Sequence, residues 1–182
     1  CVYGTDAELI NDLRTRVAPE VNVYSVVVPT AISFMLPEGH SRSGKEQPFL
    51  DAIGEALSPS VRHVDAFTSL QAHRDEPLYF KSDHHWTGRG AYYAYRAFCE
   101  RAGLVAPSLE AMERRVKHRF QGSMFRYTRD EVIKKVREDV EYWLPPVKYT
   151  ATRRPFKRQK KVVETEFLQE KSKGYGVFLG AD

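Results

Sequence analysis

Residues 21–28, VNVYSVVV, restrict the possible folds more than any other segment of this chain. The run is almost wholly apolar and rich in β-branched valine, as in a strand covered on both faces, and Pro29 stops it. Apolar residues at helical spacing precede it over residues 9–17, and residues 61–64 form a short second strand. Strands alternating with helices predict a mostly parallel sheet with helices packed on it, the α/β class.

The same helical spacing recurs farther along the chain. It predicts helices over residues 49–57 and 91–102, with Thr87 as the N-cap of the second and Gly103 at its end. Residues 65–73 fit either one more helix or an irregular connection. The apolar positions expected to face the core are Leu9, Ile10, Leu13 and Val17, then Phe49, Leu50, Ile53 and Leu57, then Ala91, Tyr92, Tyr95, Phe98, Cys99 and Ala102.

Length and composition indicate one globular domain. The chain has 182 residues, of which 42% are hydrophobic, so it can bury a core and wholesale disorder is excluded. No run approaches the roughly 18 apolar residues of a membrane helix, so no transmembrane segment is expected. Cys1 and Cys99 do not make a disulfide framework. We interpret residues 1–182 as a single domain, with a sheet-and-helix half over 1–114 and a basic, extended elaboration over 115–182.

Positive charge is concentrated in the second half. Residues 113–161 hold 16 Lys and Arg against 6 Asp and Glu, whereas the rest of the chain holds 12 against 18. A solvated loop or strand pair explains the most basic stretch, residues 148–161, and contact with an anionic cell-surface polymer is the next interpretation. Nucleic acid is not expected as a partner, because the stretch lacks a recognisable binding motif. The expected polymer contacts are Lys157, Arg158, Lys160 and Lys161.

The densest chemistry lies in the segment YFKSDHHWTGRGAYYAY. In an extended stretch, residues two apart share a side, which would bring Asp83 and His85 together and turn His84 elsewhere. A carboxylate beside an imidazole fixes the tautomer of the ring and stabilises its protonated form, as a general base requires. We therefore take Asp83 and His85 as candidate catalytic residues, and Trp86 and Tyr79 as candidate substrate contacts.

Two other interpretations of this segment stay open. Adjacent histidines near the start of a helix often act as caps or as satisfied, partly buried groups. Asp and His are also metal ligands, but three consecutive residues seldom supply three ligands, and no HxH or HExxH spacing supports them. We accordingly expect no metal and no organic cofactor.

The sequence resembles the DHHW family, through Asp83, His84, His85 and Trp86 and the continuation TGRGAYYAY. Further segments that resemble family elements, in the same order, are VVVPTAISFMLP, VDAFTSLQAH, FQGSMF and YGVFLGAD, so the resemblance covers most of the chain. It implies a variant of the SGNH (GDSL-like) hydrolase fold, a three-layer α/β/α sheet domain. Relatives of this kind include the acyltransferase domains that O-acetylate alginate and similar bacterial exopolysaccharides.

The resemblance also implies roles for the motif. In those relatives an Asp-x-His-Trp motif supplies the acid and base of a Ser-His-Asp triad. Asp83 matches the orienting acid, His85 the base and Trp86 the motif tryptophan, while the role of His84 is open. The family's nucleophilic serine follows the Leu-Gly-Gly element, and this sequence stops at Asp182 just before that point. We expect a truncated domain with the nucleophile downstream; loss of the nucleophile is the alternative.

Ser123, in FQGSMF, is the best internal substitute for the nucleophile, but no GxSxG-like elbow surrounds it. We expect it to be a turn residue after Gly122, and we expect no esterase activity from residues 1–182 alone.

For the complete protein, the resemblance implies an extracytoplasmic O-acyltransferase or acyl esterase of the cell envelope. Its partners would be a cell-surface polysaccharide, an acyl donor or acceptor, and other export or acetylation machinery. The rival hypothesis is a non-catalytic module that keeps the SGNH scaffold and binds an anionic polysaccharide or an assembly partner.

Overall fold

The computed structural model describes residues 2–37, 39–41, 46–153, 163–166 and 168–178. The chain divides into two compact units. The first consists of Cys1–Phe80 and His84–Ala106, and the second of Lys81–Asp83 and Pro107–Asp182. The division therefore falls inside the DHHW motif, between Asp83 and His84.

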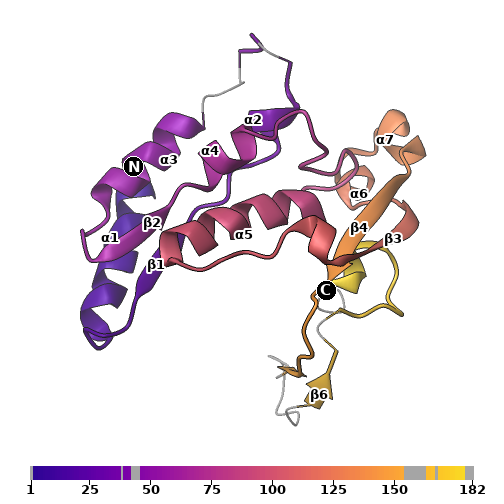
Figure 1. Cartoon of the computed structure of the whole chain (residues 1–182). Helices are drawn as coiled ribbons and strands as arrows, with labels where there is room; N and C mark the ends of the chain where they lie inside the picture. Colours follow the sequence, from indigo (N-terminus) through magenta and orange to yellow (C-terminus); the bar gives the residue numbers. More distant parts are fainter. Residues whose placement is uncertain (1, 38, 42–45, 154–162, 167, 179–182) are drawn as a thin grey trace. The chain divides into compact units, whose positions relative to one another are not determined.

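The first unit is α/β, as the sequence predicts (Figure 1). Its elements are α1 Val2–Arg16, β1 Val23–Val26, α2 Ile32–Met35, α3 Gln47–Ala56, β2 Val61–Val64, α4 Ala66–Gln71 and α5 Gly88–Ala102. Strands β1 and β2 pair in parallel, with Val23 opposite Val61 and Val26 opposite Val64.

Helices cover both faces of this strand pair. Val23 packs against a cluster that contains Ala7 of α1, whereas the ring of Tyr24 lies 5.1 Å from that of Phe98 in α5. Successive side chains of a strand point to opposite faces, so α1 and α5 lie on opposite sides of β1. Helix α3 packs on α1, and α4 packs on α5 (Figure 1). The result is the expected three-layer arrangement, α/β/α.

Local signals place the helix ends correctly. The Thr87 side chain accepts a hydrogen bond from the Gly90 N–H at 3.1 Å, and α5 ends at Gly103, whose φ of 71° is left-handed. The carboxylate of Asp65 caps α4 by accepting from the Thr68 N–H at 2.9 Å. This cap explains why residues 65–73, ambiguous in sequence, begin with a helix.

Burial differs from the sequence pattern in four places, one of which is Phe49 of α3, expected in the core but 47% exposed. The strand predicted over residues 21–28 shortens to β1, and Val26 and Val28 are 40% and 41% exposed instead of covered on both faces. In α1, Leu9 and Leu13 are more than half exposed. Tyr95 of α5 is also exposed, while Tyr93 is buried. Periodicity shows which residues share a face, but neighbouring elements decide which face is covered.

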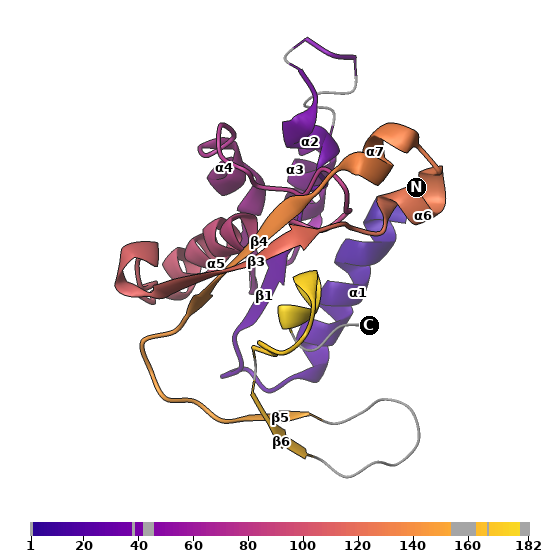
Figure 2. The same cartoon turned by 90° about the vertical axis from the view of Figure 1, so that its right-hand side faces the viewer.

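The second unit consists of short elements, several of them extended (Figure 2). They are η1 Leu109–Ala111, β3 Glu113–Phe120, α6 Met124–Thr128, α7 Glu131–Lys135, β4 Glu138–Leu144, β5 Ala151–Arg153, β6 Val163–Thr165 and η2 Gly174–Val177. Strands β3 and β4 are antiparallel and lie side by side in Figure 2, as do β5 and β6. The extended pieces were predicted, whereas the short helices α6 and α7 were not.

Candidate functional site

The DHHW motif lies on a tight loop of the chain. Tyr79 and Trp86 form an antiparallel bridge, and the Phe80 N–H donates to the His85 carbonyl at 3.3 Å. Between them, residues 81–85 are bends, so the segment is not extended as we assumed from sequence. The loop then leads into α5 at Thr87.

Asp83 is 7% exposed, and Ser123 holds its carboxylate. The Ser123 N–H donates to Asp83 Oδ2 at 2.7 Å, and the Ser123 hydroxyl donates to the same oxygen at 3.0 Å. Ser123 directly follows Gly122, as expected of a turn residue, but its hydroxyl also orients the motif aspartate. Sequence reasoning missed this contact.

Glu138 of β4 holds the residues just before Asp83. Its carboxylate accepts hydrogen bonds from the N–H groups of Lys81 and Ser82, both at 2.8 Å, and from the Ser82 hydroxyl at 2.6 Å. Ser82 is fully buried, and its hydroxyl oxygen accepts from the Gly122 N–H at 3.0 Å. Nothing in the sequence singled out Glu138, because it lies 56 residues from Ser82.

Gly122 allows the close approach of the two segments. A Cβ atom on it would collide with the Asp83 Cβ atom and the Ser82 carbonyl oxygen. Any other residue would therefore push the loop away from the motif. This contact explains the glycine of FQGSMF, the one signal in the sequence that pointed to the region.

The two histidines are less buried than Asp83. His84 is exposed and His85 half-buried, and their ring centroids lie 3.9 Å apart. Asp83, His84 and His85 each offer one potential ligand atom, and these three atoms lie within 4.8 Å of one another. These are ligand types that zinc accepts, so the segment can act as an acid–base pair or as part of a metal site.

Tyr79 belongs to the core of the first unit. It is 6% exposed, its ring stacks on that of Phe34 at 5.9 Å, and its hydroxyl donates to the Pro29 carbonyl. Burial, with a smaller contribution from the Glu46 carboxylate, raises the pKa of Tyr79 well above its usual value. We therefore do not carry Tyr79 into the proposed site. Trp86 is half-buried and packs against the same core cluster.

Glu76 forms a second network, before the motif. Its carboxylate accepts from the Tyr93 hydroxyl at 2.6 Å and from Arg89 at 3.0 Å, and His73 Nδ1 lies at 3.0 Å. Burial raises the pKa of Glu76, but the hydrogen bonds from Tyr93, His73 and Arg89 outweigh it, so the pKa falls below its ordinary value. The network ties the start of α5 to the turn before the motif.

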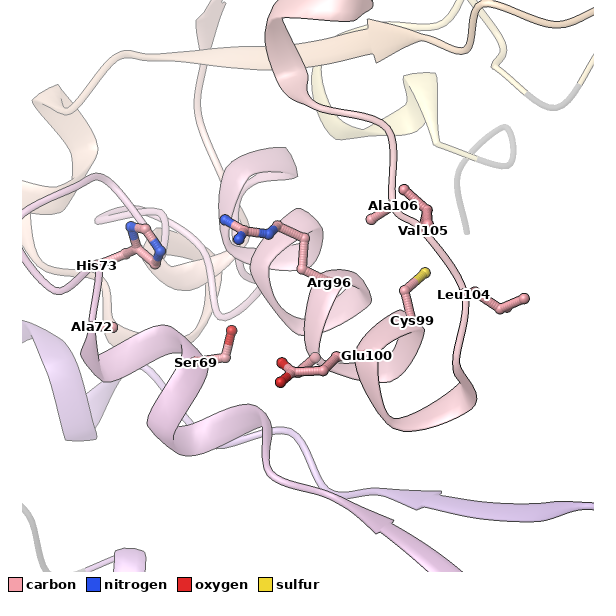
Figure 3. A pocket seen from close by; sticks show the side chains of 10 residues that line it. Ser69, Ala72, His73, Arg96, Cys99, Glu100, Leu104, Val105 and Ala106 are labelled. Atoms are coloured by element: carbon pink, nitrogen blue, oxygen red, sulfur yellow. The ribbon is translucent and has the colours of Figure 1, made fainter.

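A pocket of about 400 Å³ lies beside α5 (Figure 3). Cys99 lines it and is buried and free, as expected of a small apolar residue. The pocket also holds Arg96 and Glu100, one helical turn apart, so it presents both signs of charge. In Figure 3 the His73 ring and the Arg96 guanidinium are neighbours among the labelled side chains that line the pocket.

The remaining predicted contacts cannot be placed. Lys157, Arg158, Lys160 and Lys161 lie outside the described residues. Among the residues that are described, none forms a helix with the length and apolarity that a bilayer crossing requires.

Comparison with known proteins gives a family match over nearly the whole chain. A family model described as "DHHW protein" matches residues 4–182. No curated protein matches the chain.

Three solved structures share the fold. A DHHW family protein from Eubacterium siraeum is 30% identical, with a TM-score of 0.86, and the match covers 99% of this chain and 61% of that one. Bacillus cereus PatB1 is 19% identical, with a TM-score of 0.70 and 97% and 65% coverage. The O-acetyltransferase domain of Pseudomonas putida AlgJ is 15% identical, with a TM-score of 0.52 and 78% and 54% coverage. The chain thus spans less than two thirds of each relative.

Proposed function

Because this chain belongs to the DHHW family, we propose that it supplies the acid and the base of a Ser-His-Asp O-acyltransferase or acyl esterase. The acyl acceptor is a bacterial cell-surface polysaccharide, and the protein works outside the cytoplasm. The nucleophilic serine lies outside residues 1–182. That placement is compatible with the fact that the chain spans 61% of the E. siraeum relative.

The proposed reaction is acyl transfer in two halves. In the first, His85 takes the proton of the serine hydroxyl while the serine oxygen attacks the acyl carbonyl carbon. His85 then gives that proton to the departing alcohol, which leaves an acyl-serine. In the second half, a sugar hydroxyl, or water in an esterase, attacks the acyl-serine, and His85 carries the proton back to the serine. Asp83 orients the imidazole and stabilises its protonated form throughout.

The observation that carries this proposal is the anchoring of Asp83. The N–H and the hydroxyl of Ser123 both donate to one oxygen of this buried carboxylate. An acid that orients a base must itself be held, because small displacements of a catalytic group cost much of the rate. The donor role of its hydroxyl also favours Ser123 as a positioning residue over Ser123 as a nucleophile.

Two relatives support the reaction class. One solved structure with this fold is an O-acetyltransferase domain, that of P. putida AlgJ. PatB1 has also been solved with a sulfonyl adduct, at 19% identity and a TM-score of 0.70. A sulfonyl adduct forms when a protein nucleophile displaces the leaving group of a sulfonyl reagent, which is the behaviour expected of an activated serine.

The test is hydrolysis of 4-nitrophenyl acetate by the complete protein and by two histidine variants. We expect His85→Ala to lower kcat/KM by about 10²–10⁴-fold, the usual contribution of a general base. His40→Ala, at an exposed loop histidine, is the matched control and should leave the rate unchanged. Equal rates for wild type and His85→Ala would exclude the enzyme and favour the binding module. We also expect the protein to keep full hydrolytic activity after EDTA treatment. If EDTA abolishes the activity and added Zn²⁺ restores it, the site is a metal site and the acid–base mechanism is wrong.

A further inference from the structure

A pocket in the second unit forms where strand β3 becomes irregular. The register of β3 against β4 shifts between Lys117 and Phe120, and Arg119 inside this interval has a φ of 63°. A left-handed backbone is strained for a residue with a side chain, so such a position needs support from its surroundings. Residues 117–121 and 171–174 line a cavity of about 520 Å³ here. Ligand pockets typically measure roughly 300–1,000 Å³.

Positive charge dominates this cavity. Its ionisable lining residues are Lys117, His118, Arg119, Lys171 and Lys173, and among the residues that the structure describes no acidic side chain lines it. Lys117 donates to the Glu170 carbonyl oxygen, and His118 lies 3.1 Å from Asp139. Within the described parts of the chain, Arg119, Lys171 and Lys173 have no ion-pair partner.

Glu170, the residue before Lys171 in the chain, already has partners of its own. Glu170 accepts hydrogen bonds from Arg115 at 2.6 Å and from the Tyr142 hydroxyl at 2.7 Å. The hydrogen bonds from Tyr142 and Arg115 hold the pKa of Glu170 below its ordinary value, so it stays ionised and paired. It therefore does not neutralise the three cations of the pocket.

We propose that this pocket binds the carboxylate or phosphate groups of an anionic glycan polymer. Three exposed cations can form charge-assisted hydrogen bonds to such groups, and the Ser172 hydroxyl adds a neutral donor for a sugar oxygen. A polymer suits the site better than a single ion, because the cations come from two segments of the chain. The site is distinct from the basic stretch at residues 148–161.

Single-stranded nucleic acid fits the pocket less well. Its binding proteins stack bases on exposed aromatic rings. Phe120 is the one phenylalanine, tyrosine or tryptophan among the described lining residues, and it is half-buried and packs beside Gly174.

The position along the chain connects the pocket with the proposed reaction. Gln121 lines the pocket, and the next two residues, Gly122 and Ser123, hold Ser82 and Asp83. A polymer bound here would lie beside the loop that orients the catalytic acid. The role of acceptor subsite rests on the proposed function, whereas the binding itself does not.

Binding measurements with defined polymers test the proposal without any use of activity. The probes are polygalacturonate, its fully methyl-esterified form and a phosphomannan, titrated into the complete protein at low ionic strength. The pocket variant is Arg119→Asn with Lys171→Gln and Lys173→Gln, since asparagine tolerates the left-handed backbone. The control variant removes the same charge outside the pocket and outside residues 148–161, by Arg126→Gln, Arg129→Asn and Lys135→Gln. Arg129 is also left-handed, with a φ of 56°.

We expect at least one anionic polymer to bind, and the pocket variant to weaken it about tenfold or more, because each exposed charge contact contributes a few-fold. The stronger of the two anionic probes identifies the charged group. The control variant should bind the anionic polymers with nearly the affinity of the wild type. The methyl-esterified polymer should bind weakly to every variant. Equal weakening by both variants, equal binding of the methyl ester, or binding of a single-stranded oligonucleotide in place of the glycans would each overturn the proposal. An unchanged thermal unfolding curve for the pocket variant separates lost binding from lost folding.

Discussion

Two glutamates organise the two sides of the motif by different means. Glu76, in the first unit, is surrounded by charged and polar side chains, namely Arg89, His73 and Tyr93. Glu138, in the second unit, instead accepts from the backbone of Lys81 and Ser82 and from the Ser82 hydroxyl. Side-chain partners tie elements together, whereas backbone partners define the path of a loop. We therefore expect Glu76 to serve stability and Glu138 to serve the geometry of Asp83.

We expect the largest effect from a substitution at Gly122, which lies in the second unit with Glu138 and contacts Ser82 and Asp83. A methyl group in Gly122→Ala collides with Asp83 and the Ser82 carbonyl, so the loop must move. We expect ester hydrolysis by the complete protein to fall about 100-fold, the cost of a displacement near 1 Å. A Gly39→Ala variant is the control for activity, because Gly39 lies in an exposed turn outside the motif and its φ of 80° makes the alanine a source of backbone strain there. Near-normal activity in Gly122→Ala would show that the Ser123 contact does not orient the acid.

Exchanging the two carboxylates for amides sharpens the comparison. Glu138→Gln should lower kcat about tenfold, because an amide presents only one acceptor oxygen to three donors. Glu76→Gln should instead lower the free energy of unfolding by about 1–2 kcal/mol, the typical cost of weakened hydrogen bonds to a charged group. Urea unfolding and ester hydrolysis, both measured on both variants, show which glutamate supports stability and which supports activity. The reverse pattern would refute the division of roles.

The smallest expected effect is on pH dependence. The pKa of Glu76 is lowered from its ordinary 4.5 in the folded protein, so its contribution to stability is complete above that value. The contribution is lost as the pH falls through the lowered folded pKa. Unfolding of wild type and Glu76→Gln should therefore differ most above pH 4.5 and converge in more acidic solution. A constant difference across this range would show that the Glu76 charge does not matter.

Local signals in the sequence predicted much of the first unit. The caps at Thr87 and Gly103 and the strand at residues 61–64 were correct, because each depends on neighbouring residues only. The positions of Leu9 and Leu13 were not, since a helix pattern does not say which side meets the protein. The second unit was less predictable, because its short helices depend on few residues and weak periodicity.

The candidate site divides in the same way. Asp83, His85 and the family membership of the chain follow from the order of residues alone, because the motif is one continuous segment. The contacts that hold this segment join residues far apart, such as Ser123 to Asp83 over 40 positions and Glu138 to Ser82 over 56. No local propensity encodes such pairs. Only the tertiary structure decided them, because they form when packing brings distant backbone segments within hydrogen-bond distance.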